Sequence, residues 1–192
     1  PANLYVTAQN QSTTYGSILV LPQSGSSAYS TLGLRNGDYV SSATLLYSGN
    51  QTIPGTTNAG IYSASVDISG ATGLGMSNYR ISYVPGDLTI AKAVLTVTAV
   101  DSAKFVGMSD PSGYGGVIYS GFKNSDSATS GALGSAVISV SRSNVSENNA
   151  GSYAAVLAPN VSTDLTNYTV AYVPGKFTIV GANQLLVQVG SN

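Results

Sequence analysis

The carboxylates are the groups in this sequence best suited to acid–base chemistry, because histidine and cysteine are both absent. Without these residue types the usual general base, the thiol nucleophile and most transition-metal ligands are missing. Paired carboxylates can hydrolyse glycosides, but the eight acidic residues are scattered along the chain. Only Asp38 and Asp126 recur in a repeated motif, where Asn-Gly-Asp and Asn-Ser-Asp are typical of turns. The sequence therefore predicts a protein that is not an enzyme and that uses no cofactor.

A calcium site and an internal cross-link are two further chemistries that charged residues can support. Calcium loops need several carboxylates at close spacing, whereas Asp101 and Asp110 only flank one loop. We interpret both as solvated loop carboxylates and predict no metal site. An isopeptide cross-link needs a buried lysine beside an Asn or Asp and a carboxylate. Lys92 lies near a repeat boundary, but the next repeat has Gly181 at that position, so we expect no such cross-link.

The thirteen tyrosines are the remaining candidates for a binding site, because aromatic rings often contact carbohydrate and protein surfaces. Those that recur in both halves of the chain are interpreted as core or strand-pairing residues. They are Tyr62 with Tyr153, Tyr79 with Tyr168, and Tyr83 with Tyr172. A speculative ligand-binding patch is assigned to tyrosines without such a counterpart. These are Tyr5, Tyr39, Tyr47 and Tyr114.

The elements that must position these side chains come in two copies of one module. Residues 78–90 and 167–179 share the pattern Asn-Tyr-x-x-x-Tyr-Val-Pro-Gly-x-x-Thr-Ile, 89 positions apart. Residues 4–8 and 95–99 share Leu-x-Val-Thr-Ala. A period of this length is the signature of a repeat protein, in which each copy forms one structural unit.

The repeat sets the predicted domain boundaries. We assign a first module to residues 1–91 and a second to residues 92–181. Residues 185–189 repeat the opening strand pattern, so 182–192 is predicted to hold the first strand of a third module or a tail. No flexible linker separates the modules, which predicts an elongated, end-to-end arrangement.

Alternation of apolar and polar residues predicts β-strands throughout each module. Leu95, Val97 and Ala99 are expected to point into a core, with the intervening threonines facing outward. The Val-Pro-Gly steps are interpreted as turns, which predicts a hairpin between residues 79–84 and 88–90 and its equivalent in copy two.

Two smaller features complete the prediction of local structure. Helical periodicity is weak, and the best candidate is a short turn at 127–133 after Asp126. The pair Tyr15 and Gly16 in copy one is matched to Phe105 and Gly107 in copy two.

Composition excludes several classes of partner. Charged residues make up 8% of the chain and the net charge is −1, so no basic patch could neutralise nucleic-acid phosphates. No apolar run approaches the roughly twenty residues that a membrane-spanning helix needs. A hydrophobic content of 43% supplies a core, so the chain is expected to fold and to bind neither nucleic acid nor the membrane interior.

The order of the motifs, found twice, resembles the bacterial MBG ("mostly beta-grasp") family. Its modules occur in tandem in filamentous-haemagglutinin-like and two-partner-secreted adhesins. The resemblance rests on Leu-x-Val-Thr-Ala, an aromatic-Gly pair, Gly-Leu-x-Asn-Gly-Asp, Ala-Gly-x-Tyr and the closing Asn-Tyr-x-Ile-x-Tyr-Val motif, and it covers nearly the whole chain. Copy two departs at Ser125, where copy one has Gly37. The resemblance implies all-β, tandem β-grasp-like modules with at most a short helix, and it implies no particular ligand.

These observations lead to one functional hypothesis and two alternatives. The leading hypothesis, which the resemblance implies, is an extracellular stalk module of a secreted or surface-anchored bacterial adhesin, acting in cell adhesion or biofilm matrix cohesion. The first alternative is a carbohydrate-binding module for an exopolysaccharide or host glycan, which clustering of the unmatched tyrosines would favour. The second is homotypic association through edge strands that the low charge leaves unprotected.

Overall fold

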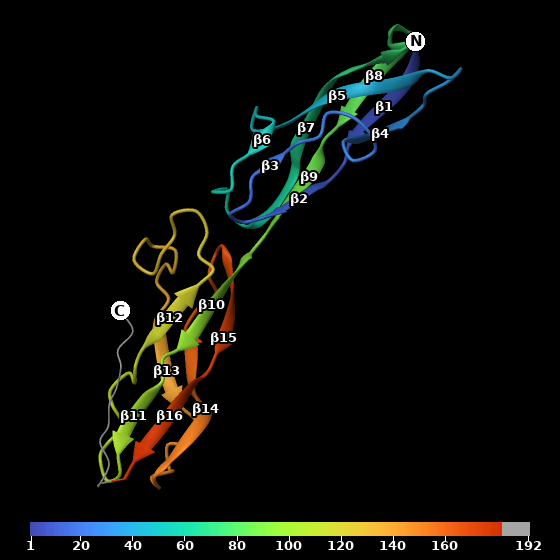
Figure 1. Cartoon of the computed structure of the whole chain (residues 1–192). Coiled ribbons are helices and arrows are strands. Elements are labelled where there is room, and N and C mark those ends of the chain that lie inside the picture. Colours follow the sequence, from blue (N-terminus) through green and yellow to red (C-terminus); the bar gives the residue numbers. More distant parts are fainter. Residues whose placement is uncertain (182–192) are drawn as a thin grey trace. The chain divides into compact units, whose positions relative to one another are not determined.

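The structure is a computed structural model that describes residues 1–181 and divides the chain into two compact units, Pro1–Lys92 and Ala93–Asn192 (Figure 1). Within the described residues there is no α-helix, and the one helical segment is the 3₁₀ turn η1 (Met76–Asn78). The prediction of an all-β protein is therefore confirmed. The strand predicted at 185–189 lies outside the described residues.

Unit one contains a three-stranded sheet, a four-stranded sheet and a short ribbon. The first sheet has the order β4-β1-β8 and the second the order β2-β9-β7-β5, while β3 and β6 form the ribbon. In the first sheet β1 runs antiparallel to β4 and parallel to β8. The strands are β1 (Ala2–Ala8), β2 (Gln11–Thr14), β3 (Leu19–Val20), β4 (Tyr29–Leu32), β5 (Tyr39–Tyr47), β6 (Thr52–Ile53), β7 (Gly60–Leu74), β8 (Tyr79–Val84) and β9 (Gly86–Ala91).

Unit two repeats the two sheets without the ribbon, within its described residues. Its sheets have the orders β12-β10-β15 and β11-β16-β14-β13. The pairing directions match those of unit one, with β10 antiparallel to β12 and parallel to β15. The strands are β10 (Ala93–Ala99), β11 (Ser102–Phe105), β12 (Val117–Ser120), β13 (Ile138–Arg142), β14 (Gly151–Val161), β15 (Tyr168–Val173) and β16 (Gly175–Val180).

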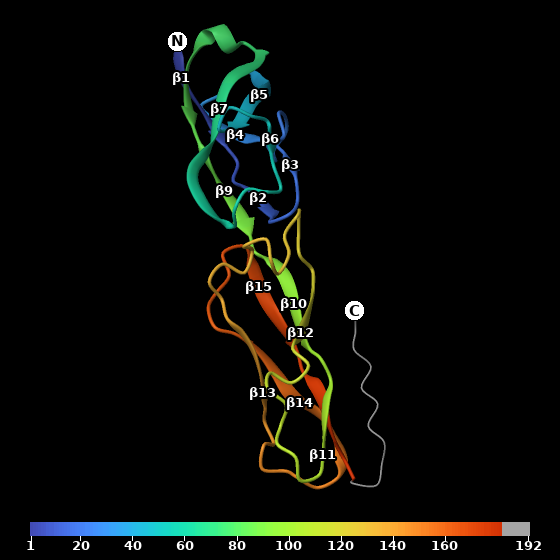
Figure 2. The same cartoon turned by 90° about the vertical axis from the view of Figure 1, so that its left-hand side faces the viewer.

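Two long strands connect the sheets of each unit. In unit one, Ala2 pairs with Tyr79 in the first sheet and Gln11 pairs with Leu88 in the second. The paired residues are 77 positions apart in both sheets, so the register does not change between them. The segments β1–β2 and β8–β9 are therefore two continuous strands that lie parallel and pass together from one sheet to the other. The run of β8 into β9, and of β15 into β16, can be followed in Figures 1 and 2.

The hairpin predicted at each Val-Pro-Gly step is wrong. β8 and β9 do not pair with each other, because β8 pairs with β1 while β9 pairs with β2 and β7. Pro85 lacks an N–H group and so interrupts the ladder where the strand changes sheets. An added Cβ on Gly86 would lie 2.8 Å from the main-chain oxygen of Ala8, and one on Gly175 would lie 2.6 Å from that of Ala99. Glycine is needed here for a close approach of two backbones, not for a turn.

The predicted alternation of buried and exposed residues is confirmed in the opening strands. Leu95 and Val97 are fully buried and Ala99 is 3% exposed, while the threonines between them are half-buried. The same face of β1 buries Leu4, Val6 and Ala8. Each unit therefore has its own core, placed between its two sheets.

Two further local predictions can be compared with the structure, and the second needs correction. The short turn predicted at 127–133 is one of a series of turns over residues 127–136, and the positive φ angles of Gly131 (86°) and Gly134 (57°) explain why no helix propagates from it. The residue equivalent to Tyr15 is Val106, not Phe105. Each of these two donates its N–H to the last residue of its partner strand, Tyr15 to Ala91 and Val106 to Val180.

Candidate functional site

A groove in unit one lies between β4 and β5, which are edge strands of different sheets. Its volume is about 530 Å³. The Tyr29 hydroxyl donates a hydrogen bond of 3.1 Å to the main-chain oxygen of Val40 and so joins the two strands. Tyr39 lines the groove with 55% of its surface exposed. The other lining residues are uncharged and mostly polar: Gln9, Gly25, Ser26, Ser30, Thr31, Leu34 and Ser41.

The structure does not place the other three candidate tyrosines in this groove. Tyr5 lies on β1 and is 46% exposed. Tyr47 packs edge-on against Tyr62, with ring centroids 6.0 Å apart. Tyr114 belongs to unit two, where it packs edge-on against Phe177 at 5.8 Å. Tyr39 alone among the four therefore combines an exposed ring with a groove lined by hydroxyl and amide groups, a setting that suits a neutral polar ligand.

The recurring pair Tyr79 and Tyr168 holds the loop after β4 and the loop after β12. Tyr168 is 2% exposed, and its hydroxyl accepts a hydrogen bond from the N–H of Lys123 (2.9 Å) and donates one to Asp126 (2.5 Å). Tyr79 forms the same pair of bonds with Arg35 (2.8 Å) and Asp38 (2.9 Å). The two recurring aspartates therefore act in loop structure.

Three other recurring tyrosines, Tyr62, Tyr153 and Tyr83, also make structural contacts. The hydroxyl of Tyr62 donates to the main-chain oxygen of Asn58 at 2.8 Å, and Tyr153 makes the same bond to Asn149 at 2.9 Å. Tyr83, 38% exposed on β8, accepts a hydrogen bond from the N–H of Ala71. These contacts explain why the Asn-Ala-Gly-x-Tyr pattern appears twice.

Unit two contains a buried charge cluster that the sequence analysis did not anticipate. Asp110, in the loop after β11, forms ion pairs with Lys104 on β11 (2.8 Å) and with Arg142 on β13 (3.1 Å). Lys104 and Arg142 are only 7% and 4% exposed. Lys104 also donates to the side-chain oxygen of Asn148 (2.7 Å), and the Tyr114 hydroxyl donates to Asp110 (3.1 Å).

Arg142 is held by main-chain and aromatic groups as well. Its Nη2 donates to the main-chain oxygens of Val145 and Glu147, and its guanidinium carbon lies 4.5 Å from the centre of the Phe177 ring. A cation over an aromatic face is attracted by the negative charge of that face. The cluster therefore ties the loops after β11 and β13 to the end of the core.

Electrostatics keeps Asp110 ionised. Burial by itself raises the pKa of Asp110, but hydrogen bonds from Lys104 and Tyr114 and the charges of Arg142 and Lys104 outweigh burial and lower the pKa. The pKa of Tyr114 is raised, first by burial and then by its hydrogen bond to Asp110. An ionised carboxylate between two cations is the stable state of this cluster at neutral pH.

Lys104, Asn148 and Asp110 are the three kinds of group that an isopeptide bond requires. In that reaction the neutral amine forms a bond to the amide carbon of the asparagine and ammonia leaves, while a protonated carboxyl donates to the amide oxygen. Here the lowered pKa of Asp110 and the charge of Arg142 oppose the protonated carboxyl that the reaction needs. The geometry supports an ion pair rather than a cross-link.

The interpretation of Asp101 and Asp110 as solvated loop carboxylates is wrong for Asp110, whose side chain is 23% exposed and pairs with Lys104 and Arg142. Asp101 accepts a hydrogen bond from the N–H of Lys176 (2.7 Å) and lies 3.6 Å from its ammonium group. Among residues 1–181, no group of three or more potential ligand side chains could hold a metal ion. The sequence contained one signal of the charge cluster, since Lys104 stands at an inward position of a strand.

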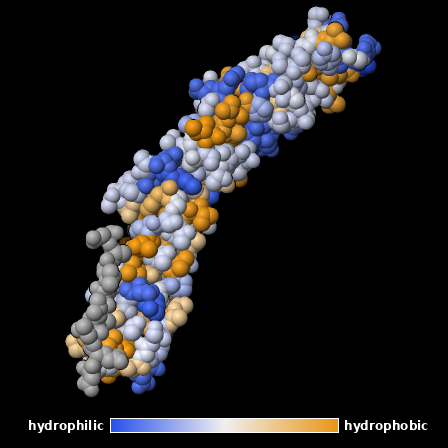
Figure 3. All heavy atoms as spheres, in the orientation of Figure 1, coloured by the Kyte–Doolittle hydropathy of each residue, from blue (hydrophilic) through white to orange (hydrophobic). Residues whose placement is uncertain are grey.

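On the face in Figure 3, hydrophilic and hydrophobic residues alternate over short distances in both units. No helix within residues 1–181 is long and apolar enough to cross a membrane.

Comparison with known proteins gives one result. The family model described as MBG domain (YGX type) matches residues 4–89 and again residues 95–178. No curated protein and no solved structure shows a significant match to the chain.

Proposed function

Because the chain belongs to the MBG domain (YGX type) family and carries two copies of its domain, we propose that it is a stalk segment of a bacterial adhesin. The adhesin is secreted or anchored at the cell surface, and it is of the filamentous-haemagglutinin-like or two-partner-secreted type. The segment acts outside the cell, in adhesion or in cohesion of a biofilm matrix. It has no catalytic role.

The observation that carries this proposal is the role of the residues that recur between the two copies. The buried tyrosines hold loops, the glycines of the Val-Pro-Gly steps permit close backbone contact, and the alternating apolar residues form the cores. A stalk needs repeated structure and no repeated binding site. The groove of unit one has no such recurrence, because Tyr39 has no counterpart among the tyrosines of copy two.

The proposal is tested by displaying the chain on cells between a membrane anchor and a tip domain that binds a known receptor. Adhesion to receptor-coated beads should depend on the tip and should improve as the 192-residue segment is duplicated. The segment without the tip should not bind a panel of exopolysaccharides and host glycans. Saturable binding of the segment alone would replace the stalk proposal with a recognition module.

A second candidate function is carbohydrate binding, which the groove around Tyr39 favours. An exposed ring flanked by Ser30, Thr31 and Ser41 offers one stacking surface and several hydroxyl groups to a sugar. The glycan panel described above tests it when Tyr39→Ala is compared with Tyr5→Ala, a matched exposed tyrosine outside the groove. Binding that Tyr39→Ala abolishes and Tyr5→Ala retains would establish the groove as a site for an exopolysaccharide or host glycan.

A further inference from the structure

β5 in unit one and β13 in unit two are equivalent edge strands. Tyr47 of β5 pairs with Val66, which pairs with Gly86 of the first Val-Pro-Gly step. Arg142 of β13 pairs with Leu157, which pairs with Gly175 of the second step. Counting back along each strand, Ala43 and Leu45 of unit one therefore correspond to Ile138 and Val140 of unit two.

In unit one, a segment of the same chain covers the outer edge of β5. The N–H of Ala43 donates to the main-chain oxygen of Gln23 (3.0 Å), and the N–H of Leu45 donates to its side-chain oxygen (2.9 Å). The side-chain nitrogen of Gln23 donates back to the main-chain oxygen of Leu45 (3.2 Å). Leu21, two residues earlier, is 2% exposed. The segment Leu21-Pro22-Gln23 thus completes the edge as a short strand would.

In unit two, the corresponding edge has no such cover within the described residues. Ser143 donates to Val156 and Ser162 donates to Val137, which fixes the odd-numbered residues of β13 as those bonded to β14. Pro159, which lacks an N–H group, accordingly stands opposite Val140. The N–H and C=O groups of Ile138 and Val140 therefore point away from β14.

A shorter connection explains why the described part of unit two supplies no such cover. In unit one, residues 15–28 connect β2 to β4 and contain both β3 and the covering segment. The equivalent connection in unit two, residues 106–116, is three residues shorter and contains no strand. It is held instead by the ion pairs of Asp110.

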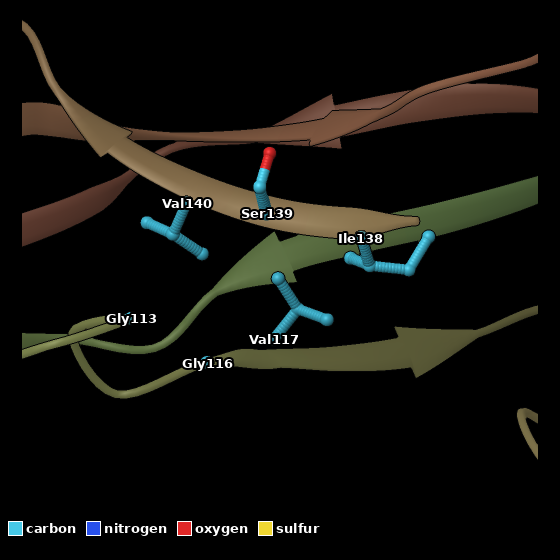
Figure 4. A pocket seen from close by; sticks show the side chains of 6 residues that line it. All are labelled: Gly113, Gly116, Val117, Ile138, Ser139 and Val140. Atoms are coloured by element: carbon cyan, nitrogen blue, oxygen red, sulfur yellow. The ribbon is translucent and has the colours of Figure 1, made fainter. Parts of the chain in front are cut away.

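The uncovered edge faces an apolar groove of about 260 Å³ between β12 and β13 (Figure 4). The side chains of Val117, Ile138 and Val140 point into it, whereas Ser139 points to the other side of its strand. Gly113 and Gly116 complete the lining, which contains no charged side chain among residues 1–181. An unpaired edge beside an apolar groove is a site for strand addition.

We propose that Leu185–Val189 of this chain occupies the groove as an added strand, with Leu186-Val187-Gln188 in the role that Leu21-Pro22-Gln23 plays in unit one. Both segments have a leucine two positions before a glutamine and carry no charge. The leucine fills the groove beside Val140. The glutamine side chain pairs with the main-chain groups of Val140, as Gln23 does with Leu45.

The length of the chain allows this placement. Along the strand direction, Val180 and Val140 are separated by the length of β16 plus two residues of β13, about 23 Å. The added strand also lies about three strand spacings of 4.8 Å to the side of β16, so the straight-line distance is about 27 Å. The eight residues from Val180 to Gln188 span up to about 29 Å when extended. Eight extended residues are therefore long enough to span the distance to the groove.

The same five residues were predicted above as the first strand of a third repeat. A first strand needs partners equivalent to β12 and β15, which would come from residues beyond the 192 printed here. The proposal concerns the 192-residue chain, and it does not depend on the proposed stalk function.

The experiment measures amide hydrogen exchange by NMR in the 192-residue chain and in a chain shortened to residues 1–181. Exchange at Ile138 and Val140 should be at least tenfold slower in the longer chain, because docking supplies partners for that edge. Ser139 and Ser141, bonded to β14, should exchange alike in both chains. Gln188→Ala should speed exchange at Val140, and Ser191→Ala, outside the segment, should not.

Three results would overturn the proposal. The first is equal exchange at Ile138 and Val140 in the two chains. The second is protection that appears only at concentrations where the chain dimerises, which would assign the groove to a strand of a second copy. The third is unchanged exchange in Leu186→Asp, the full-length variant to be measured if the shortened chain does not fold.

Discussion

At the scale of the residue, the recurring tyrosines act through their hydroxyl groups as much as through their rings. Tyr168 and Tyr79 each bridge a main-chain N–H and an aspartate, so a loop is fixed to the core by two hydrogen bonds. Such a bridge is specific to tyrosine, because phenylalanine fills the same space without the bonds. This explains why both copies keep tyrosine at a position where burial alone would accept any aromatic residue.

Replacing Tyr168 by phenylalanine tests the bridge. Tyr168→Phe should destabilise unit two by about 1–3 kcal/mol, because it removes a buried hydroxyl that serves both a donor and an acceptor. Denaturant unfolding followed by circular dichroism measures the change. Tyr172→Phe, at a 47% exposed position of β15, is the matched control and should change stability by less than about 0.5 kcal/mol. Equal effects of the two variants would refute the bridge.

The charge cluster leads to a second prediction at this scale, that no covalent bond forms between Lys104 and Asn148. Because Asp110 is ionised between Lys104 and Arg142, Lys104 should keep a free amine. The intact mass of the folded chain should therefore equal the mass of its sequence. A mass lower by one ammonia, with a peptide linking Lys104 to Asn148 after digestion, would show that the cross-link forms despite the lowered pKa of Asp110.

At the scale of the element, the distinctive feature is a strand pair that passes from one sheet to the other. The pair β1–β2 and β8–β9 keeps one register through the change of sheet, as does its equivalent in unit two. Such continuity requires the two backbones to approach closely where the strands bend. Gly86 and Gly175 stand at that point.

A methyl group at the crossing should therefore be costly. Gly175→Ala places a Cβ 2.6 Å from the main-chain oxygen of Ala99, and overpacking of this kind costs roughly 1–3 kcal/mol. The temperature at which unit two unfolds should fall accordingly. Ser152→Ala, at an exposed position of the neighbouring strand β14, serves as the control. If Gly175 were only a turn residue with free space around it, the two variants would behave alike.

The cover of β5 gives another prediction for a single element. Gln23→Ala removes the side-chain partner of the Leu45 N–H but keeps the main-chain oxygen that binds the N–H of Ala43. Amide exchange at Leu45 should accelerate at least tenfold, while exchange at Ala43 changes less. Exchange that rises equally at both positions would mean that the variant detaches the whole segment from the edge.

Sequence reasoning predicted the faces of the strands but not their partners. Alternation identified Leu95, Val97 and Ala99 as core residues, because period two follows from the geometry of a single strand. A Pro-Gly step between two strands is compatible with a hairpin or with one strand that changes sheets. Only the pairing of β8 with β1, which is not local in sequence, distinguishes the two arrangements. The cluster around Asp110 joins residues from β11, β13 and two loops, so no local pattern could bring them together.

At the scale of the whole molecule, the two units share a topology but differ in the groups that hold the connections beside their cores. Unit one carries the ribbon β3–β6, with Leu21 and Ile53 almost fully buried. In unit two the corresponding connections, residues 106–116 and 143–150, are shorter and contain no ribbon, and Asp110 of the first pairs with Lys104 of β11 and Arg142 of β13. These connections are therefore held through apolar burial in unit one and through charge in unit two.

This difference makes unit two sensitive to acid in a way that depends on Asp110. Because the pKa of Asp110 is lower in the folded than in the unfolded chain, its stabilising effect is complete above the unfolded value of about 3.9 and is lost as the pH falls through the folded value. Lys104, Arg142 and Tyr114 all face this carboxylate, and both cations remain charged as it is protonated. Below pH 4, unit two should therefore lose stability through the unpaired cations.

Asp110→Asn separates this effect from general acid denaturation. At pH 7 the variant should be less stable by about 3 kcal/mol, the lower end of the cost of breaking a buried ion pair, because the Asp110 side chain is 23% exposed. Thermal unfolding between pH 7 and pH 2, followed by NMR, uses the methyl signals of Leu95 for unit two and those of Leu4 for unit one. The difference between wild type and variant should shrink at Leu95 as the pH falls below 4, since protonation removes the same charge as the substitution. A difference that persists undiminished at pH 2 would show that Asp110 stabilises unit two through its hydrogen bonds and packing, and not through its charge.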